Sequence, residues 1–196
     1  MKKGLLALIT VSTLVATTAS AEENWYDETK GFIGIEGGQS KISATGSNLS
    51  GFETDTSSYE NEIGIRLGAV ERDWRVTLEA WLRDNPSGTQ LDRANLAIDS
   101  YFLASTMDFP LQPFIGAHAG YMGYKSNVAV GGGSTQLFEQ SGAAFGIQAG
   151  ATLNLDIVSV DVGYRYSITK LSQDISGNNV KVDSLGNYYI ALDLRF

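Results

Sequence analysis

The segment YYIALDLRF, residues 188–196, places apolar side chains at every second position up to the last residue. Tyr188, Ile190, Leu192, Leu194 and Phe196 share one face, and Tyr189, Ala191, Asp193 and Arg195 share the other. Strict alternation of this kind predicts a β-strand with one apolar and one polar face. Terminal residues usually fray into water unless they are tied into a sheet, so this ending predicts a strand that must stay paired.

The same period of two recurs along the chain. Residues 62–70 (EIGIRLGAV) place Ile63, Ile65 and Leu67 opposite Glu62, Gly64 and Arg66. An amphipathic helix would instead repeat its apolar positions every three or four residues. We predict eight strands, which span Gly31–Lys41, Glu62–Val70, Trp74–Asp84, Ala94–Ser105, Pro113–Lys125, Ser141–Leu153, Ile157–Thr169 and Tyr188–Phe196.

The connections between these strands alternate in length. Short turns are predicted near 71–73, 106–112 and 154–156, and longer polar loops at 42–58, 85–91, 126–140 and 171–184. Strands of about ten residues are long enough to cross a bilayer at a tilt, and short and long connections at opposite ends are typical of outer-membrane barrels. The fold class predicted is therefore an all-β, eight-stranded, antiparallel, up-and-down transmembrane β-barrel.

The first residues have a different character. Lys2 and Lys3 precede the apolar run Leu5–Val15, and Ala19-Ser20-Ala21 follows it. This pattern predicts a secretory signal peptide at 1–21, and the run is too short for a spanning helix. We expect a periplasmic segment at 22–30 and the outer-membrane barrel at 31–196, with no further domain.

Composition limits the possible functions. Without Lys2 and Lys3, twelve of the 14 basic residues remain against 22 acidic ones, a net charge of −10. That balance argues against nucleic acid or anionic lipid as the main partner. The chain has no cysteine and only one histidine, and no group of residues has the spacing of a metal site, so we expect no metal and no cofactor.

The alternation alone does not say which face looks inward, because a soluble lipocalin-like barrel would turn its apolar face to the lumen. Three observations favour the opposite orientation: the polar faces are rich in glycine, their charges are nearly balanced, and aromatic residues lie near the ends of the apolar faces. Balanced charges suit an enclosed lumen, where an unpaired charge is costly. The balance predicts a network of lumen charges made of Glu62, Arg66, Arg75, Glu79, Asp161, Arg165 and Asp193. The aromatic residues in question are Trp74, Phe102, Tyr121, Tyr164, Tyr166, Tyr188 and Phe196.

The signal peptide, the eight strands, PFIGAHAGY (113–121), VDVGYRY (160–166) and the ending at 188–196 resemble the small outer-membrane β-barrels of Gram-negative bacteria, of the OmpA transmembrane-domain type. The resemblance implies a location in the cell outer membrane. It also implies that Tyr188, Ile190, Leu192, Leu194 and Phe196 form the signal read by the barrel-assembly machinery. The peptidoglycan-binding domain of full-length OmpA has no counterpart, so a cell-wall tether is not expected.

Three functions stay open from the sequence. The first, which we favour, is a monomeric structural surface protein in outer-membrane lipid, with a plugged lumen and loops that could contact an extracellular ligand; Phe52, Leu137 and Phe138 are the exposed-apolar candidates. The second is a narrow porin or transport barrel for small molecules. The third is a lipid A-modifying enzyme, for which His118 is the one candidate residue, but it has no serine near it on its own strand, so we expect no enzyme.

Overall fold

The computed structural model describes residues 29–46, 59–84, 90–102, 110–130, 134–155, 157–175 and 178–196. The predicted signal peptide and Phe52 lie outside these residues, as does most of the predicted periplasmic segment. No helix in the described ranges is both long enough and apolar enough to cross a membrane.

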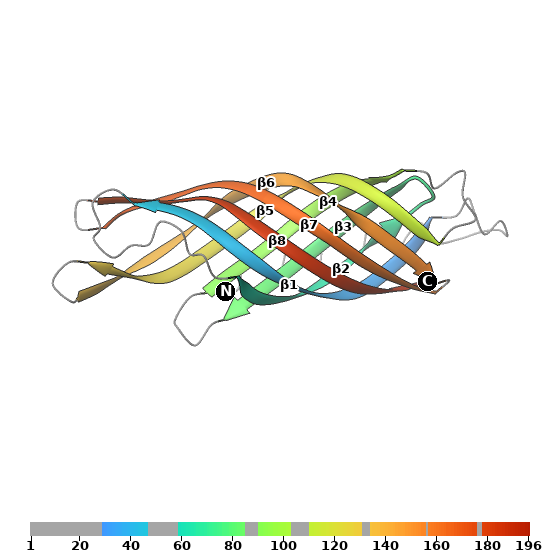
Figure 1. The fold of residues 1–196 in the computed structure, drawn as a ribbon, viewed down its shortest axis with the longest axis horizontal. Helices are drawn as coiled ribbons and strands as arrows, with labels where there is room; N and C mark the ends of the chain where they lie inside the picture. Colours follow the sequence, from blue (N-terminus) through green and yellow to red (C-terminus); the bar gives the residue numbers. More distant parts are fainter. Residues whose placement is uncertain are drawn as a thin grey trace.

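The described residues form eight antiparallel strands in one closed barrel (Figure 1). The strands are β1 (Lys30–Gly46), β2 (Glu60–Val70), β3 (Trp74–Asp84), β4 (Gln90–Tyr101), β5 (Leu111–Val130), β6 (Ser134–Leu155), β7 (Val158–Ile175) and β8 (Asn178–Arg195). Each strand pairs with its neighbours in sequence, and β8 pairs with β1 to close the sheet. The predicted fold class is confirmed.

The end of the chain is held on both sides. In β8, Leu194 pairs with Ile33 of β1 and with Val158 of β7. Phe196 and Gly31 exchange two backbone hydrogen bonds, of 2.9 and 3.0 Å. The chain therefore remains in the ladder to its last residue, as its alternating pattern predicts.

The orientation of the two faces follows the prediction. Outward-facing Ile33, Ile63, Leu82 and Ile147 are 56–67% exposed, whereas inward-facing Asp99, Asp161 and Arg165 have no exposed surface. A surface of exposed aliphatic side chains around a closed sheet is suited to lipid, because hydrocarbon offers no hydrogen bonds and the closed ladder leaves no sheet edge unpaired.

Two of the predicted long loops are wrong. Residues 126–140 and 171–184 mostly belong to β5, β6, β7 and β8, which run on to leave only the short connections at 131–133 and 176–177 between them. These strands project beyond the ends of β2, β3 and β4 (Figure 1). The loop predicted at 42–58 begins too early, because β1 extends to Gly46. Strand β4 begins and ends about four residues earlier than predicted.

The reason for these errors is that the apolar residues change from the outward face of the strands to the inward face in the projecting part of the barrel. In the projecting part, apolar side chains point inward and polar ones outward, so a rule of apolar-outward alternation no longer recognises the strand. The inward apolar residues there form one buried cluster, which we call the apolar cap: Ile42, Ala44, Leu91, Met122, Phe138, Ala144, Leu171, Ile175, Val180, Val182 and Leu185.

A β-bulge in β8 produces part of this exchange. Ser43 and Ala44 of β1 pair with Ser184 and Val182, which leaves Asp183 as an extra residue in β8. Between the bulge and the C-terminus, the inward residues of β8 have odd numbers, such as Asn187 and Tyr189. On the projecting side of the bulge they have even numbers, such as Val182. One extra residue moves a strand's side chains to the opposite face.

Removal of Leu194–Phe196 tests the importance of the closing pair. The truncation would leave backbone groups of β1 and β7 unpaired in the membrane, where each costs several kcal/mol. We expect the truncated chain to refold poorly in detergent micelles without assembly machinery, as measured by the heat-dependent shift in gel migration. A control with Phe196→Leu, which keeps the ladder, should refold like the native chain. Equal refolding of the truncated chain would contradict a structural role for these last residues.

Candidate functional site

The inner wall of the barrel carries the buried charged side chains of the described strands. Six acidic residues and five arginines are buried there: Glu36, Glu62, Glu79, Asp99, Asp161, Asp193, Arg66, Arg75, Arg83, Arg93 and Arg165. They point inward because every second residue of each strand faces the lumen. Buried charges are tolerated when they are paired and hydrogen-bonded, so the partners of these groups define the site.

Most of the charges belong to one continuous chain of contacts. Arg66 bonds both Asp193 and Asp161, the latter at 2.5 Å, and Asp161 also accepts from Arg75. The Nη2 atom of Arg75 donates to Asp99 at 2.8 Å.

The chain of contacts continues through an uncharged residue. Gln148 donates to Asp99 at 2.6 Å and accepts from Arg165 at 2.8 Å. Arg165 in turn pairs with Glu79 at 2.5 Å. The chain thus joins residues of β2, β3, β4, β6, β7 and β8 across the lumen.

A second chain lies nearer the apolar cap. Glu62 accepts hydrogen bonds from Arg93, Ser40 and Asn187, the last at 3.2 Å. Arg83 donates to Ser40 at 3.0 Å and pairs with Glu60 at 3.2 Å.

The structure therefore brings six of the seven predicted charges together: Arg66, Arg75, Glu79, Asp161, Arg165 and Asp193. Glu62 lies in the second chain and has no recorded hydrogen bond to the other six among the described residues. Arg93 lies outside the predicted set because the predicted strand begins at Ala94, whereas β4 begins at Gln90. The signal was available, since Arg93 and Asn95 continue the inward alternation of β4.

Aromatic rings pack against the arginines of the lumen. The guanidinium carbon of Arg75 lies 4.9 Å from the ring centroid of Phe114, and that of Arg93 lies 5.0 Å from Trp81. Arg165 lies 4.7 Å from the centroid of Tyr189. Such contacts attract a cation to the ring face and fill the space that water would otherwise occupy.

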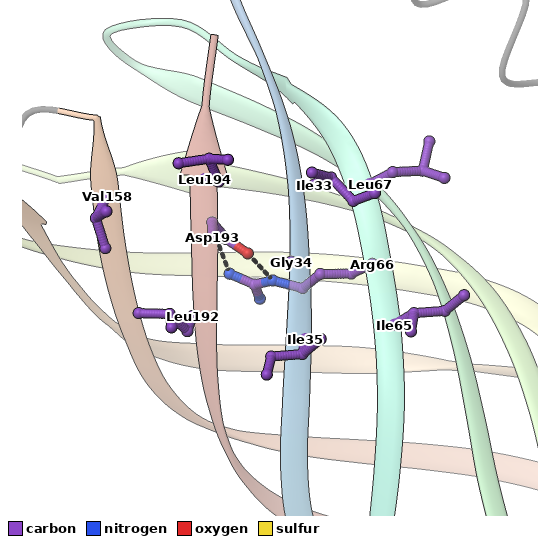
Figure 2. Close-up of a pocket in the computed structure, with 10 residues that line it drawn as sticks. All are labelled: Ile33, Gly34, Ile35, Ile65, Arg66, Leu67, Val158, Leu192, Asp193 and Leu194. Carbon is purple, nitrogen blue, oxygen red and sulfur yellow. Dashed lines mark hydrogen bonds and ion pairs between the residues drawn. The ribbon is translucent and has the colours of Figure 1, made fainter.

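The close packing depends on glycine in the barrel wall. Arg66 of β2 reaches past Gly34 of β1 to Asp193 of β8 (Figure 2). A Cβ atom on Gly34 would lie 2.6 Å from the carbonyl oxygen of Leu192 and would also collide with the Asp193 carboxylate. Only a glycine therefore allows this ion pair to cross beneath β1.

The outer side of the same wall has a different character. A hollow of about 360 Å³ there is lined mainly by aliphatic side chains, including Ile33, Ile35, Ile65 and Leu192 (Figure 2). It opens on the lipid-facing surface, so it belongs to the apolar belt.

His118 has a partner that its own strand did not reveal. Its Nε2 atom lies 2.9 Å from the hydroxyl oxygen of Ser167, which comes from β7. Both side chains are almost fully buried in the lumen. The expectation that no serine lies near His118 considers its own strand alone and is wrong, because β6 brings β5 and β7 within reach of each other.

Comparison with known proteins shows the fold. The chain is similar to the crystal structure of Neisserial surface protein A, with 18% identity over 87% of this chain and all of that one, and a TM-score of 0.60. It is also similar to the outer membrane protein OprG from Pseudomonas aeruginosa, with 14% identity over 88% and 99% of the two chains and a TM-score of 0.58. No family model and no curated protein matches the chain. The fold is that of the small outer-membrane β-barrels, and these neighbours support the expected location in the outer membrane.

Arg165→Leu tests whether the lumen charges stabilise the barrel. The change leaves Glu79 without its ion pair and Gln148 without a donor, and loss of one partner of a buried pair typically costs about 3–5 kcal/mol. We expect a lower midpoint of urea unfolding in detergent, with partial recovery in the double variant Arg165→Leu/Glu79→Leu. Arg72→Leu, in the exposed turn before β3, is the control and should change the midpoint far less, because contacts of exposed charges contribute only about 0–1 kcal/mol. An unchanged midpoint in Arg165→Leu would count against the network.

A matched pair of glycine variants tests the crossing beneath β1. Gly34→Ala should displace Asp193 from Arg66 and lower the unfolding midpoint. Gly37→Ala, also in β1, should have little effect, because its Cβ would lie 4.0 Å from the nearest heavy atom. Equal midpoints for the two variants would show that Gly34 is not required for the ion pair.

Proposed function

We propose that the protein is a structural protein of the outer membrane that presents its projecting strands outside the cell and keeps its lumen closed. The observation that carries this proposal is that three successive layers of side chains fill the lumen along the barrel axis. Aromatic residues Phe32, Tyr101 and Phe114 lie toward the end that holds the chain terminus, the charged chains lie in the middle, and the apolar cap lies at the projecting end.

Each layer opposes the passage of ions in its own way. Eight-stranded barrels are just wide enough for side chains to fill. Fully buried Trp81, Arg66, Arg75 and Arg165 occupy that space in the middle layer. The apolar cap offers an ion no polar partner, and an ion that crossed it would lose its hydration without compensation.

The projecting strands are what the protein offers to the outside. Leu137 is 42% exposed at this end of β6, whereas its neighbour Phe138 is buried in the apolar cap. Of the apolar candidates for an extracellular contact, Leu137 therefore stays available and Phe138 serves packing. We therefore propose that the protein presents this surface, and we assign it no particular ligand. For biogenesis we propose the alternating face of β8, with Phe196, as the assembly signal.

A narrow conduit is the second candidate, and one observation favours it. Several buried polar atoms of the lumen have no hydrogen-bond partner among the described residues, including both carboxylate oxygens of Glu36, the indole Nε1 of Trp81 and the hydroxyl of Tyr189. Buried polar groups without protein partners are usually satisfied by internal water. A file of water through the middle layer would be the beginning of a pore.

An enzymatic function has less support. The pair of His118 and Ser167 is buried in the lumen, between the apolar cap and the aromatic residues. No carboxylate hydrogen bond to His118 is recorded in the described part of the chain, so the pair lacks the third group that orients a catalytic histidine. We propose a packing role for both residues.

Conductance in planar bilayers decides between the two candidates. We expect the purified protein to give no steady conductance steps, because the three layers fill the lumen. The triple variant Arg66→Ser/Arg75→Ser/Asp161→Ser removes the centre of the larger chain and should also give no steps, because the apolar cap and the aromatic residues still block the lumen. Steady steps from the native protein would overturn the closed lumen and favour the conduit.

A further inference from the structure

The barrel wall is incomplete between β6 and β7 at the projecting end. The β6–β7 ladder ends at the pair Ala144 and Thr169, although β6 continues with β5 to Ser134 and β7 continues with β8 to Ile175. Residues 134–143 of β6 and 170–175 of β7 thus have no ladder partner across this boundary among the described residues. We call these two segments the unpaired stretch.

Side chains bridge the unpaired stretch at two levels. Near the membrane, the hydroxyl of Thr169 donates to the carbonyl of Ala143 at 3.3 Å. Farther out, Gln173 replaces a ladder partner: its Oε1 accepts from the backbone N–H of Glu139 at 2.9 Å, and its Nε2 donates to the carbonyl of Leu137 at 3.2 Å.

Between the two bridges, one apolar side chain closes the wall. Leu171 lies against Gly142, and a Cβ atom on Gly142 would be 3.0 Å from its Cδ2. Gly142 is paired with Met122 of β5, and both Leu171 and Met122 belong to the apolar cap. A molecule that displaced Leu171 would enter the apolar cap without breaking any backbone hydrogen bond between β6 and β7.

The position of the unpaired stretch relative to the membrane indicates what could enter. Phe145 and Ile168, the pair just below it, are 52% and 43% exposed and form the top of the apolar belt on these strands. The next outward residue on β7 is Lys170, which is exposed beside Leu171. An aliphatic chain could reach the apolar cap from this level while an anionic head group stays outside near the ammonium of Lys170.

We propose that the unpaired stretch is a binding site for an anionic amphiphile with a single aliphatic chain. The chain displaces Leu171 and packs in the apolar cap, which is lined by aliphatic, thioether and phenyl groups, and the head group contacts Lys170. The charged layer below the cap stops the chain from travelling further, so the site holds its ligand whether or not the lumen conducts ions.

The position of a bound chain can be measured at Met122. The protein in phospholipid nanodiscs, with ¹³C-labelled methionine methyl groups, is titrated with 16-doxylstearic acid, and the Met122 signal is assigned with Met122→Leu. We expect the nitroxide at the end of the fatty acid to broaden the Met122 signal. A phospholipid of the disc that carries the same nitroxide on one of its two chains should not broaden it, because its second chain and larger head group do not fit.

Variants of the closing residues test the route. Leu171→Ala should lower the fatty acid concentration for half-maximal broadening about tenfold, which corresponds to about 1.4 kcal/mol, and Leu171→Trp should raise it. Gln173→Ala, a change at a half-buried residue that opens the outer bridge, should accelerate the onset of broadening. Leu185→Ala is the matched control, because it removes the same atoms from the apolar cap, but on β8 away from the unpaired stretch. It should lower the half-maximal concentration less than Leu171→Ala does and should not accelerate the onset of broadening.

The head-group contact is tested separately. Lys170→Gln should weaken the effect of 16-doxylstearic acid but leave that of its methyl ester unchanged. No broadening of Met122, equal broadening by the labelled phospholipid, or equal effects of Leu171→Ala and Leu185→Ala would each overturn the site. Equal loss of both probes in Lys170→Gln would overturn the role of the lysine.

Discussion

Hydrocarbon cannot hydrogen-bond to a peptide group, and the rest of this structure depends on that constraint. An unpaired backbone group costs several kcal/mol in the bilayer, so the eight strands must close into a barrel and β8 must meet β1 along its membrane-spanning length. The last residue, Phe196, therefore forms two backbone hydrogen bonds with Gly31. The same constraint relaxes beyond the membrane, where water can satisfy the backbone, and there the β6–β7 ladder stops while both strands continue.

Closure of a barrel this narrow forces the charged side chains of its interior to pair with one another. The polar faces of the strands have nowhere to point but the lumen, and the charges they carry have to satisfy one another. Arg66, Arg75 and Arg165 do so by each contacting more than one strand, and aromatic rings such as Trp81 and Phe114 fill the space between them. The wall adapts as well: Gly34 leaves room for the pair of Arg66 and Asp193 to pass beneath β1. The closed lumen that we propose follows from this mutual pairing of the lumen charges. The amphiphile site is placed where β6 and β7 both continue past the end of their shared ladder.

The sequence predicts the barrel well within the membrane and poorly beyond it. Alternation with apolar residues outward identifies β3 to the residue and the membrane-spanning parts of the other strands, because hydrocarbon on one side and a crowded lumen on the other impose opposite demands on successive residues. Beyond the membrane those demands reverse. Phe138 and Leu171 turn inward there, and a search for the same pattern finds a loop. The charge balance predicts which residues face the lumen, but not their partners: the separation of Glu62 from the larger chain, the role of Gln148 as a link and the contact of His118 with Ser167 depend on how strands distant in sequence are aligned around the barrel.

The lipid-facing surface, the lumen network and the apolar cap all depend on the orientation of the two strand faces, which site-directed spin labelling measures directly. The chain has no cysteine, so single cysteines at Ile65 and Val160 on the outer face and at Ser167 on the inner face can be labelled without background. In nanodiscs, the labels at Ile65 and Val160 should collide with oxygen far more often than with a water-soluble nickel chelate, and the label at Ser167 should be shielded from both. Labels at Ile65 and Val160 that are reached by the nickel chelate as readily as a label in the exposed turn at Arg72 would contradict the account.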